Sequence, residues 1–152
     1  MTEKELKELA EAAKVKADSG DKDAQFNLGF MFENGQGVLK DYDIAVKYYT
    51  LAGDSEHIGA IIKLADIYRY GRPGVEKNEA LAKTSDDKVN ELVVKKKLEI
   101  DAEAGDVGAL RELATMYRKS KFVKNDEVLA KNLDTLADQL ESAASKKLQK
   151  SE

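Results

Sequence analysis

Three stretches of this chain follow one pattern: Ala24-x-x-x-Leu28-Gly29-x-x-Phe32, Ala60-x-x-x-Leu64-Ala65-x-x-Tyr68 and Ala109-x-x-x-Leu113-Ala114-x-x-Tyr117. The first two copies start 36 residues apart, and the second and third start 49 residues apart. Apolar residues with this spacing share one face of a helix. Repeats of this length are typical of stacked helix pairs, in which no single pair buries its apolar face alone.

Each copy is followed by a predicted turn and a second helix. In the first repeat the turn is Gly35-Gln36-Gly37-Val38, since glycine readily adopts the positive φ of a helix C-terminus. Asp41 is expected to cap the second helix by accepting backbone N–H groups two or three residues on. The second repeat has Tyr70-Gly71-Arg72-Pro73-Gly74-Val75 and Asn78 at the matching positions. The third has Ser120-Lys121-Phe122 in place of the glycines, so its turn is expected to be strained or to differ in geometry.

The second repeat also contains an insertion. From Val75 to Gly105 the chain is 15 residues longer than the corresponding part of the first repeat, which is about four helical turns. The insertion includes Thr84-Ser85-Asp86-Asp87, four residues that favour helix caps. We therefore expect either one long bent helix or a short helix followed by a second one that starts near Ser85.

Both ends of the chain have features of capping helices. Thr2 and Glu5 have the spacing of a capping box, and the helix that follows is expected to end near Gly20. The apolar residues expected on one face of a long C-terminal helix are Leu129, Leu133, Leu136, Leu140 and Ala144. Terminal helices with a polar outer face keep a helical repeat array soluble.

The first repeat is similar to the Sel1-like repeat, a relative of the tetratricopeptide repeat. The matching residues are Ala24, Leu28, Gly29, Phe32, Gly35, Gly37, Val38, Asp41, Ala45, Tyr48, Tyr49 and Ala52. The second repeat matches in its first helix and turn, and the third in its first helix and at Val123, Asp126, Ala130 and Ala137. The resemblance implies an all-α fold, a right-handed α/α solenoid of about three helix pairs with N- and C-terminal capping helices.

We therefore expect a single domain over residues 1–152. Its parts would be an N-terminal capping helix (1–20), repeat 1 (21–54), repeat 2 (55–106) with an inserted or extended helix near 83–100, and repeat 3 with the C-terminal capping helix (107–152).

The composition narrows the classes of function. The absence of cysteine excludes disulfides and thiol chemistry and fits a reducing compartment, so we expect a cytoplasmic protein. A net charge of −4 gives no general signal for nucleic-acid binding, and no apolar run approaches the roughly 20 residues that span a bilayer. The only histidine, His57, is expected in a turn, and no Cys/His set could hold zinc. We predict no cofactor, no metal, no catalytic residue, and no nucleic-acid or membrane partner.

Candidate binding residues lie on the side of each first helix that faces away from the shared apolar positions. At 100° per residue these are offsets 3, 6 and 10 from the first alanine. They carry Asn27, Phe30 and Asn34, then Lys63, Asp66 and Tyr70, then Glu112, Thr115 and Lys119. The sets differ among repeats, as a ligand-binding face would, but neutral drift on a solvated surface gives the same variation. Phe30 and Tyr70 favour binding, because large aromatic side chains there have no evident role in the core.

The resemblance implies that the first helices line a concave surface that binds a protein or peptide. The protein would act as an adaptor, regulator or inhibitor, and we expect a monomer. An immunity-type bacterial protein that occludes a toxin is a specialised version of this function. The alternative from another class is a hydrolase whose carboxylates act in a cleft, which requires a deep pocket with convergent titratable groups. A third possibility is a structural module that assembles through stackable ends.

Overall fold

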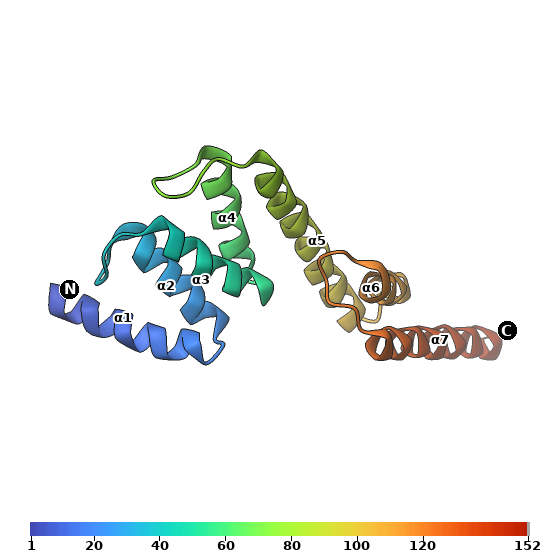
Figure 1. The fold of residues 1–152 in the computed structure, drawn as a ribbon. Coiled ribbons are helices and arrows are strands. Elements are labelled where there is room, and N and C mark those ends of the chain that lie inside the picture. Colours follow the sequence, from blue (N-terminus) through green and yellow to red (C-terminus); the bar gives the residue numbers. More distant parts are fainter. Residues whose placement is uncertain (152) are drawn as a thin grey trace. The chain divides into compact units, whose positions relative to one another are not determined.

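The computed structural model describes residues 1–151, and in this range the chain folds entirely into helices joined by short turns. The helices are α1 (Glu3–Asp18), α2 (Lys22–Asn34), α3 (Tyr42–Asp54), α4 (Ile58–Tyr70), α5 (Glu79–Glu103), α6 (Val107–Lys119) and α7 (Glu127–Lys150) (Figure 1). An isolated bridge between Arg72 and Val75 is the one extended pairing described. The predicted all-α solenoid fold is confirmed. Among the described helices, none combines the length and the hydrophobicity that crossing a membrane requires.

Helix starts are fixed by side chains that accept backbone N–H groups. Thr2 and Glu5 form the predicted capping box on α1: the Glu5 N–H donates to Thr2 Oγ1 at 3.2 Å, and the Thr2 N–H donates to Glu5 Oε2 at 2.8 Å. Asp41, Asn78 and Asp126 accept the N–H three residues on and cap α3, α5 and α7. Each such cap stabilises its helix by about 1 kcal/mol.

The first helix of each repeat has its own cap. Asp21 and Asp106 cap α2 and α6, and His57 takes the same position before α4. The His57 Nδ1 accepts the Ala60 N–H at 3.0 Å, and its ring stacks on Phe26 with the centroids 4.5 Å apart. The histidine expected in a turn is therefore the N-cap of a helix.

The turn after α6 shows how a repeat without turn glycines is closed. In the first repeat α2 ends on Gly35, which is left-handed with φ 67°. In the third repeat α6 ends on Ser120, which is extended with φ −62°. The Ser120 Oγ accepts the N–H groups of Phe122 at 3.0 Å and Val123 at 2.7 Å. The Ser120 side chain thus closes this turn, which in the first repeat is closed by a glycine with positive φ. The predicted difference in geometry is confirmed.

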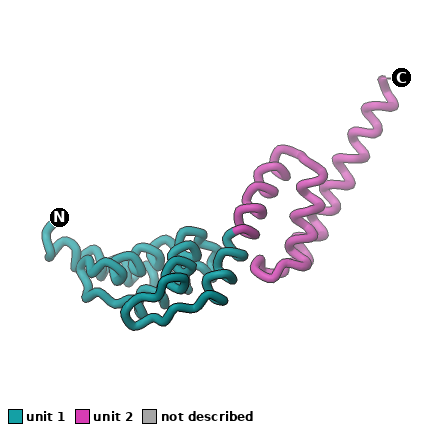
Figure 2. Tube along the Cα trace, turned by 90° about the horizontal axis from the view of Figure 1, so that it is seen from above, with its two compact units in different colours: residues 1–89 teal, residues 90–152 magenta. Residues whose placement is uncertain are grey.

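The chain forms two compact units, unit 1 (residues 1–89) and unit 2 (residues 90–152) (Figure 2). In unit 1, α1 packs on α2, α2 on α3, and α3 on α4, whereas in unit 2 α6 packs on α7. The boundary between the units falls within α5. The insertion is therefore part of one continuous helix and not a short helix followed by a second one. The single-domain boundaries drawn from the sequence stay a prediction.

The extra length of α5 gives unit 2 a helix that precedes its helix pair, as α1 precedes the first pair of unit 1. The start of α5 belongs to unit 1, where Ala82 is buried, and the rest belongs to unit 2, where Leu92 and Ala102 are buried. The two helices also end alike: Gly20 follows α1 with φ 94°, and Gly105 follows α5 with φ 87°. Each unit thus begins its first helix pair with a preceding helix to pack on.

The core of unit 1 has two buried clusters. Tyr49, Ala52 and Ala60 belong to the cluster that joins α3 and α4, whereas Ala10 and Leu28 belong to the one that joins α1 and α2. All five are buried. The repeat positions identified in the sequence therefore supply most of this core.

The core of unit 2 corrects the predicted face of α7. Leu133, Ala137 and Leu140 pack with the buried residues of α6. Three residues expected on the same face are exposed, namely Leu129, Leu136 and Ala144. Ala137 is fully buried between Leu133 and Leu140, so the face of α7 that packs on α6 is centred on these three residues.

Candidate functional site

One polar contact recurs between the two helices of every repeat. In each repeat, the first residue of the contact lies nine positions after the first alanine of the repeat pattern. The second residue lies eight positions after the N-cap of the second helix. The pairs are Glu33 with Tyr49 (2.5 Å), Arg69 with Asp86 (2.6 Å) and Arg118 with Asp134 (2.7 Å). The sequence analysis did not identify these pairs, because a helical wheel gives a direction but not the neighbour found there. A signal for these pairs was present in the sequence, because the two positions change together. They hold glutamate with tyrosine in the first repeat, and arginine with aspartate in the second and third.

The Tyr49 contact is buried. The Tyr49 hydroxyl donates to Glu33 Oε2, while its ring is fully buried and lies 5.7 Å from the Phe26 ring. Burial, and then the hydrogen bond to Glu33, raise the pKa of Tyr49 well above its usual value of about 10. This phenol therefore stays neutral and serves the structure of unit 1.

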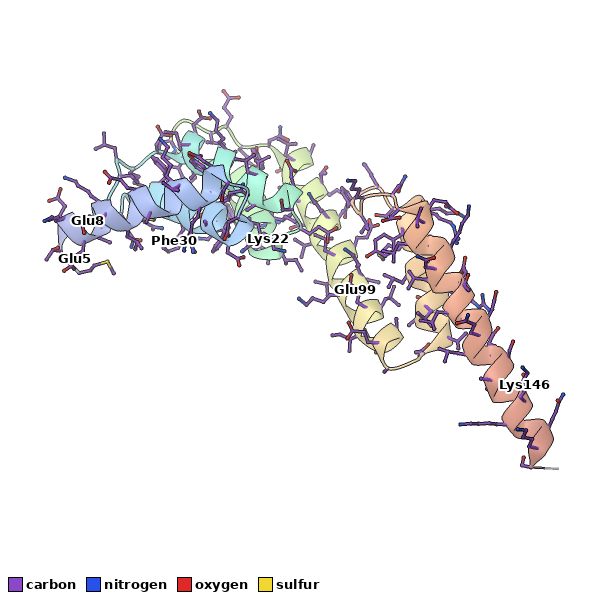
Figure 3. The ribbon with its side chains drawn as sticks, turned by 90° about the horizontal axis from the view of Figure 1, so that it is seen from below. Glu5, Glu8, Lys22, Phe30, Glu99 and Lys146 are labelled. Atoms are coloured by element: carbon purple, nitrogen blue, oxygen red, sulfur yellow. The ribbon has the colours of Figure 1, made fainter. Side chains whose placement is uncertain are left out.

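Lys63 joins the first helices of two neighbouring repeats in unit 1. Its Nζ lies 3.2 Å from Glu33 Oε2 on α2 and 5.3 Å from the centroid of the Phe30 ring. Phe30 itself is 38% exposed and is labelled on α2 in Figure 3. The cation–ring contact contributes about 0.5–1 kcal/mol at such a site. Two of the predicted binding residues, Phe30 and Lys63, are thus brought together.

The other predicted residues of unit 1 differ in their surroundings. Asp66 accepts a hydrogen bond from Arg72 Nη2 at 2.9 Å, and the Asn34 amide donates to the Phe30 carbonyl oxygen at 2.8 Å. Asn27 is exposed, and Tyr70 is 67% exposed. The surface of unit 1 therefore combines exposed aromatic rings with polar groups that are partly held by internal contacts.

The three predicted residues of unit 2 line one open groove of about 500 Å³ between α5 and α6. The groove is lined by Glu91, Val94, Leu98, Arg111, Glu112, Thr115, Met116, Lys119 and Ser120. The Thr115 hydroxyl donates to the Arg111 carbonyl oxygen at 3.0 Å. Among the residues that the structure describes, Glu112 and Lys119 have no ion-pair partner. Together with Glu91, which also lines the groove, they are charged groups that remain available to a ligand.

The side of α6 that faces α7 carries a ladder of ion pairs. Arg111 Nη2 contacts Asp138 at 2.9 Å and Glu141 at 2.6 Å. Arg118 contacts Glu127 at 3.2 Å, in addition to Asp134. The hydrogen bonds to Asp138 and Glu141 raise the pKa of Arg111 further above its normal range. Each guanidinium therefore contacts two carboxylates.

Two observations disfavour the hydrolase alternative. Among residues 1–151, no group of three or more His, Cys, Asp or Glu side chains could hold a metal ion. The unit 2 groove is open to solvent, whereas a hydrolase site needs a deep pocket that excludes water. The arrangement is suited to holding a ligand by contact and charge.

The Sel1 repeat family model matches three segments of the chain, residues 22–57, 58–83 and 107–133. The first and third segments correspond to helix pairs α2–α3 and α6–α7, and the second covers α4 and the start of α5. The unmatched residues between the second and third segments lie in the extension of α5 and the turn after it. The comparison with curated proteins found no match.

The solved structures that are similar to this chain include two repeat proteins. One is a protective antigen present in uropathogenic Escherichia coli strains and displaying an SLR fold, with 23% identity and a TM-score of 0.52 over 86% of this chain and 33% of that chain. The other is a Sel1 repeat protein from Oxalobacter formigenes, with 27% identity and a TM-score of 0.47 over 89% of this chain and 50% of that chain. The chain therefore spans between a third and a half of these proteins. The first likeness concerns the fold alone.

Proposed function

Because this chain belongs to the Sel1 repeat family, whose repeats generally mediate contacts between proteins, we propose that it is a protein- or peptide-binding module. It would act as an adaptor, regulator or inhibitor through the exposed side of its first helices. The observation that carries the proposal is the junction of α2 and α4 in unit 1. There Lys63 holds Glu33 and covers the ring of Phe30, which leaves a cation and a partly exposed aromatic side chain at one place.

The chemistry of this surface suits an interface. Buried apolar area contributes roughly 25 cal/mol per Å², so the rings of Phe30 and Tyr70 would gain from being covered. Aromatic side chains of this kind often carry most of the binding energy of an interface. Lys63 and Asp66 would select the partner through charge and hydrogen bonds.

The proposal includes a cytoplasmic monomer. The absence of cysteine supports the location, since it fits a reducing compartment. The outer end of α7 supports the monomer, because its exposed residues 141–150 are mainly polar or charged.

A peptide library displayed on phage and selected against the full chain tests the proposal. Selected peptides are titrated against the wild type, Phe30→Ala and Tyr70→Ala. Each variant should weaken binding by about 1 kcal/mol or more, the range of an interface anchor. Val15→Ala, which removes an exposed apolar side chain from α1, should leave binding unchanged. Thermal melts confirm that each variant folds. Binding that survives both aromatic substitutions would remove this surface from consideration.

A further inference from the structure

The first helices of the three repeats begin with the same backbone hydrogen bond, but α4 uses a different acceptor. In the first repeat the Ala24 N–H donates to Asp21 Oδ1 at 2.9 Å. In the third repeat an aspartate, Asp106, again accepts the matching N–H, at 2.8 Å. In the second repeat the Ala60 N–H donates to His57 Nδ1 at 3.0 Å. The start of α4 therefore depends on an imidazole, whose hydrogen bonding changes with its protonation state.

The capping contact requires the neutral form of His57. A lone pair on Nδ1 accepts the Ala60 N–H, so the single proton of the neutral ring is on Nε2. The charged ring carries a hydrogen on both nitrogens and has no lone pair to offer. Its positive charge would also lie at the positive end of the α4 dipole, which opposes it. Protonation of His57 therefore removes the cap from α4.

The position of the ring leaves no other way to keep this contact. The ring stacks on Phe26 with the centroids 4.5 Å apart, and a Cβ added to Gly59 would lie 3.1 Å from its Cε1 atom. Rotation of the ring by half a turn would put Cδ2 in the place of Nδ1, and carbon accepts no hydrogen bond. The Ala60 N–H would then keep one acceptor instead of two, the His57 carbonyl oxygen at 3.1 Å.

The charged groups on the neighbouring elements do not hold the protonated ring in the capping position. Asp23 of α2 lies 3.5 Å from Nε2, which is not the capping nitrogen, and its side chain is 77% exposed. Water and salt weaken such an attraction. Other charged groups nearby in the chain are Asp54 at the end of α3, Glu56 in the turn and Lys63 on α4. Asp54 and Lys63 each have an ion-pair partner of their own.

The turn before this cap is also more strained than the matching turns of the other two repeats. Gly20 and Gly105 hold a positive φ just before the aspartate caps, whereas Glu56 holds a φ of 62° just before His57. A residue with a Cβ atom is strained in this conformation, and glycine is not. The backbone between α3 and α4 therefore gives the start of α4 less support than a glycine would.

We propose that His57 is a pH-sensitive cap, which takes up a proton between about pH 7.5 and pH 5.5 and releases the first turn of α4. The aspartate caps of α2 and α6 hold in this range, because an aspartate ordinarily keeps its charge down to about pH 4. Acid thus loosens the joint between α3 and α4 while both helices stay folded. This inference concerns the fold of unit 1 and does not depend on the proposed function.

Solvent exchange of single amides, measured by NMR at about pH 7.5 and pH 5.5 and corrected for the intrinsic effect of pH, tests the inference. The protection of the Ala60 amide should fall at least about threefold on acidification, as expected for the loss of a cap. The amides of Ala24 and Ala109 should keep their protection, because aspartates accept them. The ¹⁵N shifts of His57 at pH 7.5 should show the proton on Nε2.

Three variants assign the response to the ring. His57→Asn keeps a capping side chain that does not titrate, so the protection of Ala60 should be equal at both pH values. His57→Asp introduces the cap of the other two repeats and should give the same result, which covers the case in which one variant does not fold. Asp23→Asn keeps the imidazole cap and should keep the response, but at lower pH, because a carboxylate that attracts the charged ring is gone.

The other outcomes would overturn the inference. Unchanged protection of Ala60 in the wild type at pH 5.5 would show that the charged ring does not release α4. An equal fall in His57→Asn, or a fall that Ala24 and Ala109 share, would show a general effect of acid. A ring that carries its proton on Nδ1 at pH 7.5 could not accept the Ala60 N–H, so the cap would be absent from the start.

Discussion

The helix pairs α2–α3 of unit 1 and α6–α7 of unit 2 use the same repeat positions but are held together by different contacts. In α2–α3 the ring of Tyr49 is fully buried, and a Cβ added to Gly29 would lie 2.8 Å from its Cδ1 and Cε1 atoms. In α6–α7 the same positions hold Ala114 and Asp134. Asp134 pairs with Arg118, and Ala114 is fully buried. The two positions change together, so one packing arrangement accepts either a buried ring or an ion pair.

The difference sets where the stability of each pair comes from. A buried aromatic side chain contributes several kcal/mol. An ion pair that keeps access to solvent contributes about 1 kcal/mol or less, because water and salt screen it. Arg118 and Asp134 keep about a third of their side-chain surface exposed. The α2–α3 pair should therefore respond strongly to a change at this position, and the α6–α7 pair only weakly.

Removal of the Tyr49 ring should have the largest effect. Tyr49→Ala leaves a cavity between α2 and α3 and should lower the free energy of unfolding by about 3–5 kcal/mol. Urea unfolding followed by circular dichroism measures the loss. A loss below about 1 kcal/mol, no larger than that expected for Asp134→Ala, would show that the two contacts are energetically equivalent.

The contact between Gly29 and Tyr49 gives the next largest effect. Gly29→Ala should cost about 1–3 kcal/mol, since the new methyl group has no room beside the ring. The same change in a Tyr49→Asp background should cost little, because the ring is gone. Urea unfolding of all four proteins completes a double-mutant cycle. An absence of coupling would mean that the ring moves aside freely.

Alkaline pH should weaken unit 1 through the same tyrosine. The pKa of Tyr49 is raised in the folded chain, whereas in the unfolded chain it is about 10. Above pH 10 unfolding therefore releases a proton, and stability falls as pH rises by up to about 1.4 kcal/mol per pH unit. Tyr49→Phe should lack this part of the slope. Tyr68, whose pKa is also raised by burial, contributes equally to both proteins. Parallel stability curves above pH 10 would contradict the prediction.

The smallest effect is expected at the ion pair of unit 2. Asp134→Ala should lower stability by about 1 kcal/mol or less, and 1 M salt should reduce the difference from the wild type. Amide exchange of α6 and α7 gives the local readout. A loss above 2 kcal/mol that salt leaves unchanged would show that this pair is effectively buried, which would narrow the contrast with Tyr49.

Local features of the fold could be predicted from the sequence. Asp41, Asn78 and Asp126 cap helices by accepting an N–H three residues away, so a short stretch of sequence contains both partners. The offsets of Phe30 and Tyr70 likewise predicted exposed side chains, and both are exposed. A helical wheel is reliable here because exposure depends mainly on direction from the core.

Contacts between distant residues could not be predicted. Lys63 contacts Phe30 and Glu33, which lie on another helix. A short sequence pattern does not predict how close residues of two different helices lie. Leu129 is exposed because the face of α7 that packs on α6 is centred on Leu133, Ala137 and Leu140, which the spacing of the leucines alone did not indicate. Nor does the sequence of the insertion reveal that the boundary between the units falls inside one helix, since Thr84-Ser85-Asp86-Asp87 left a break between two helices equally open.

The contact between Gly29 and Tyr49 also constrains how such a repeat can evolve. A lineage that moves from glycine with tyrosine to alanine with aspartate, as in α6–α7, must pass through one of two intermediates. Alanine with tyrosine places a methyl group 2.8 Å from the ring, whereas glycine with aspartate creates no clash. We therefore expect the ring to be lost first, because the reverse order passes through the destabilised intermediate. Among repeats that descend from one duplicated copy, glycine with aspartate should therefore occur at these two positions, and alanine with tyrosine should be rare.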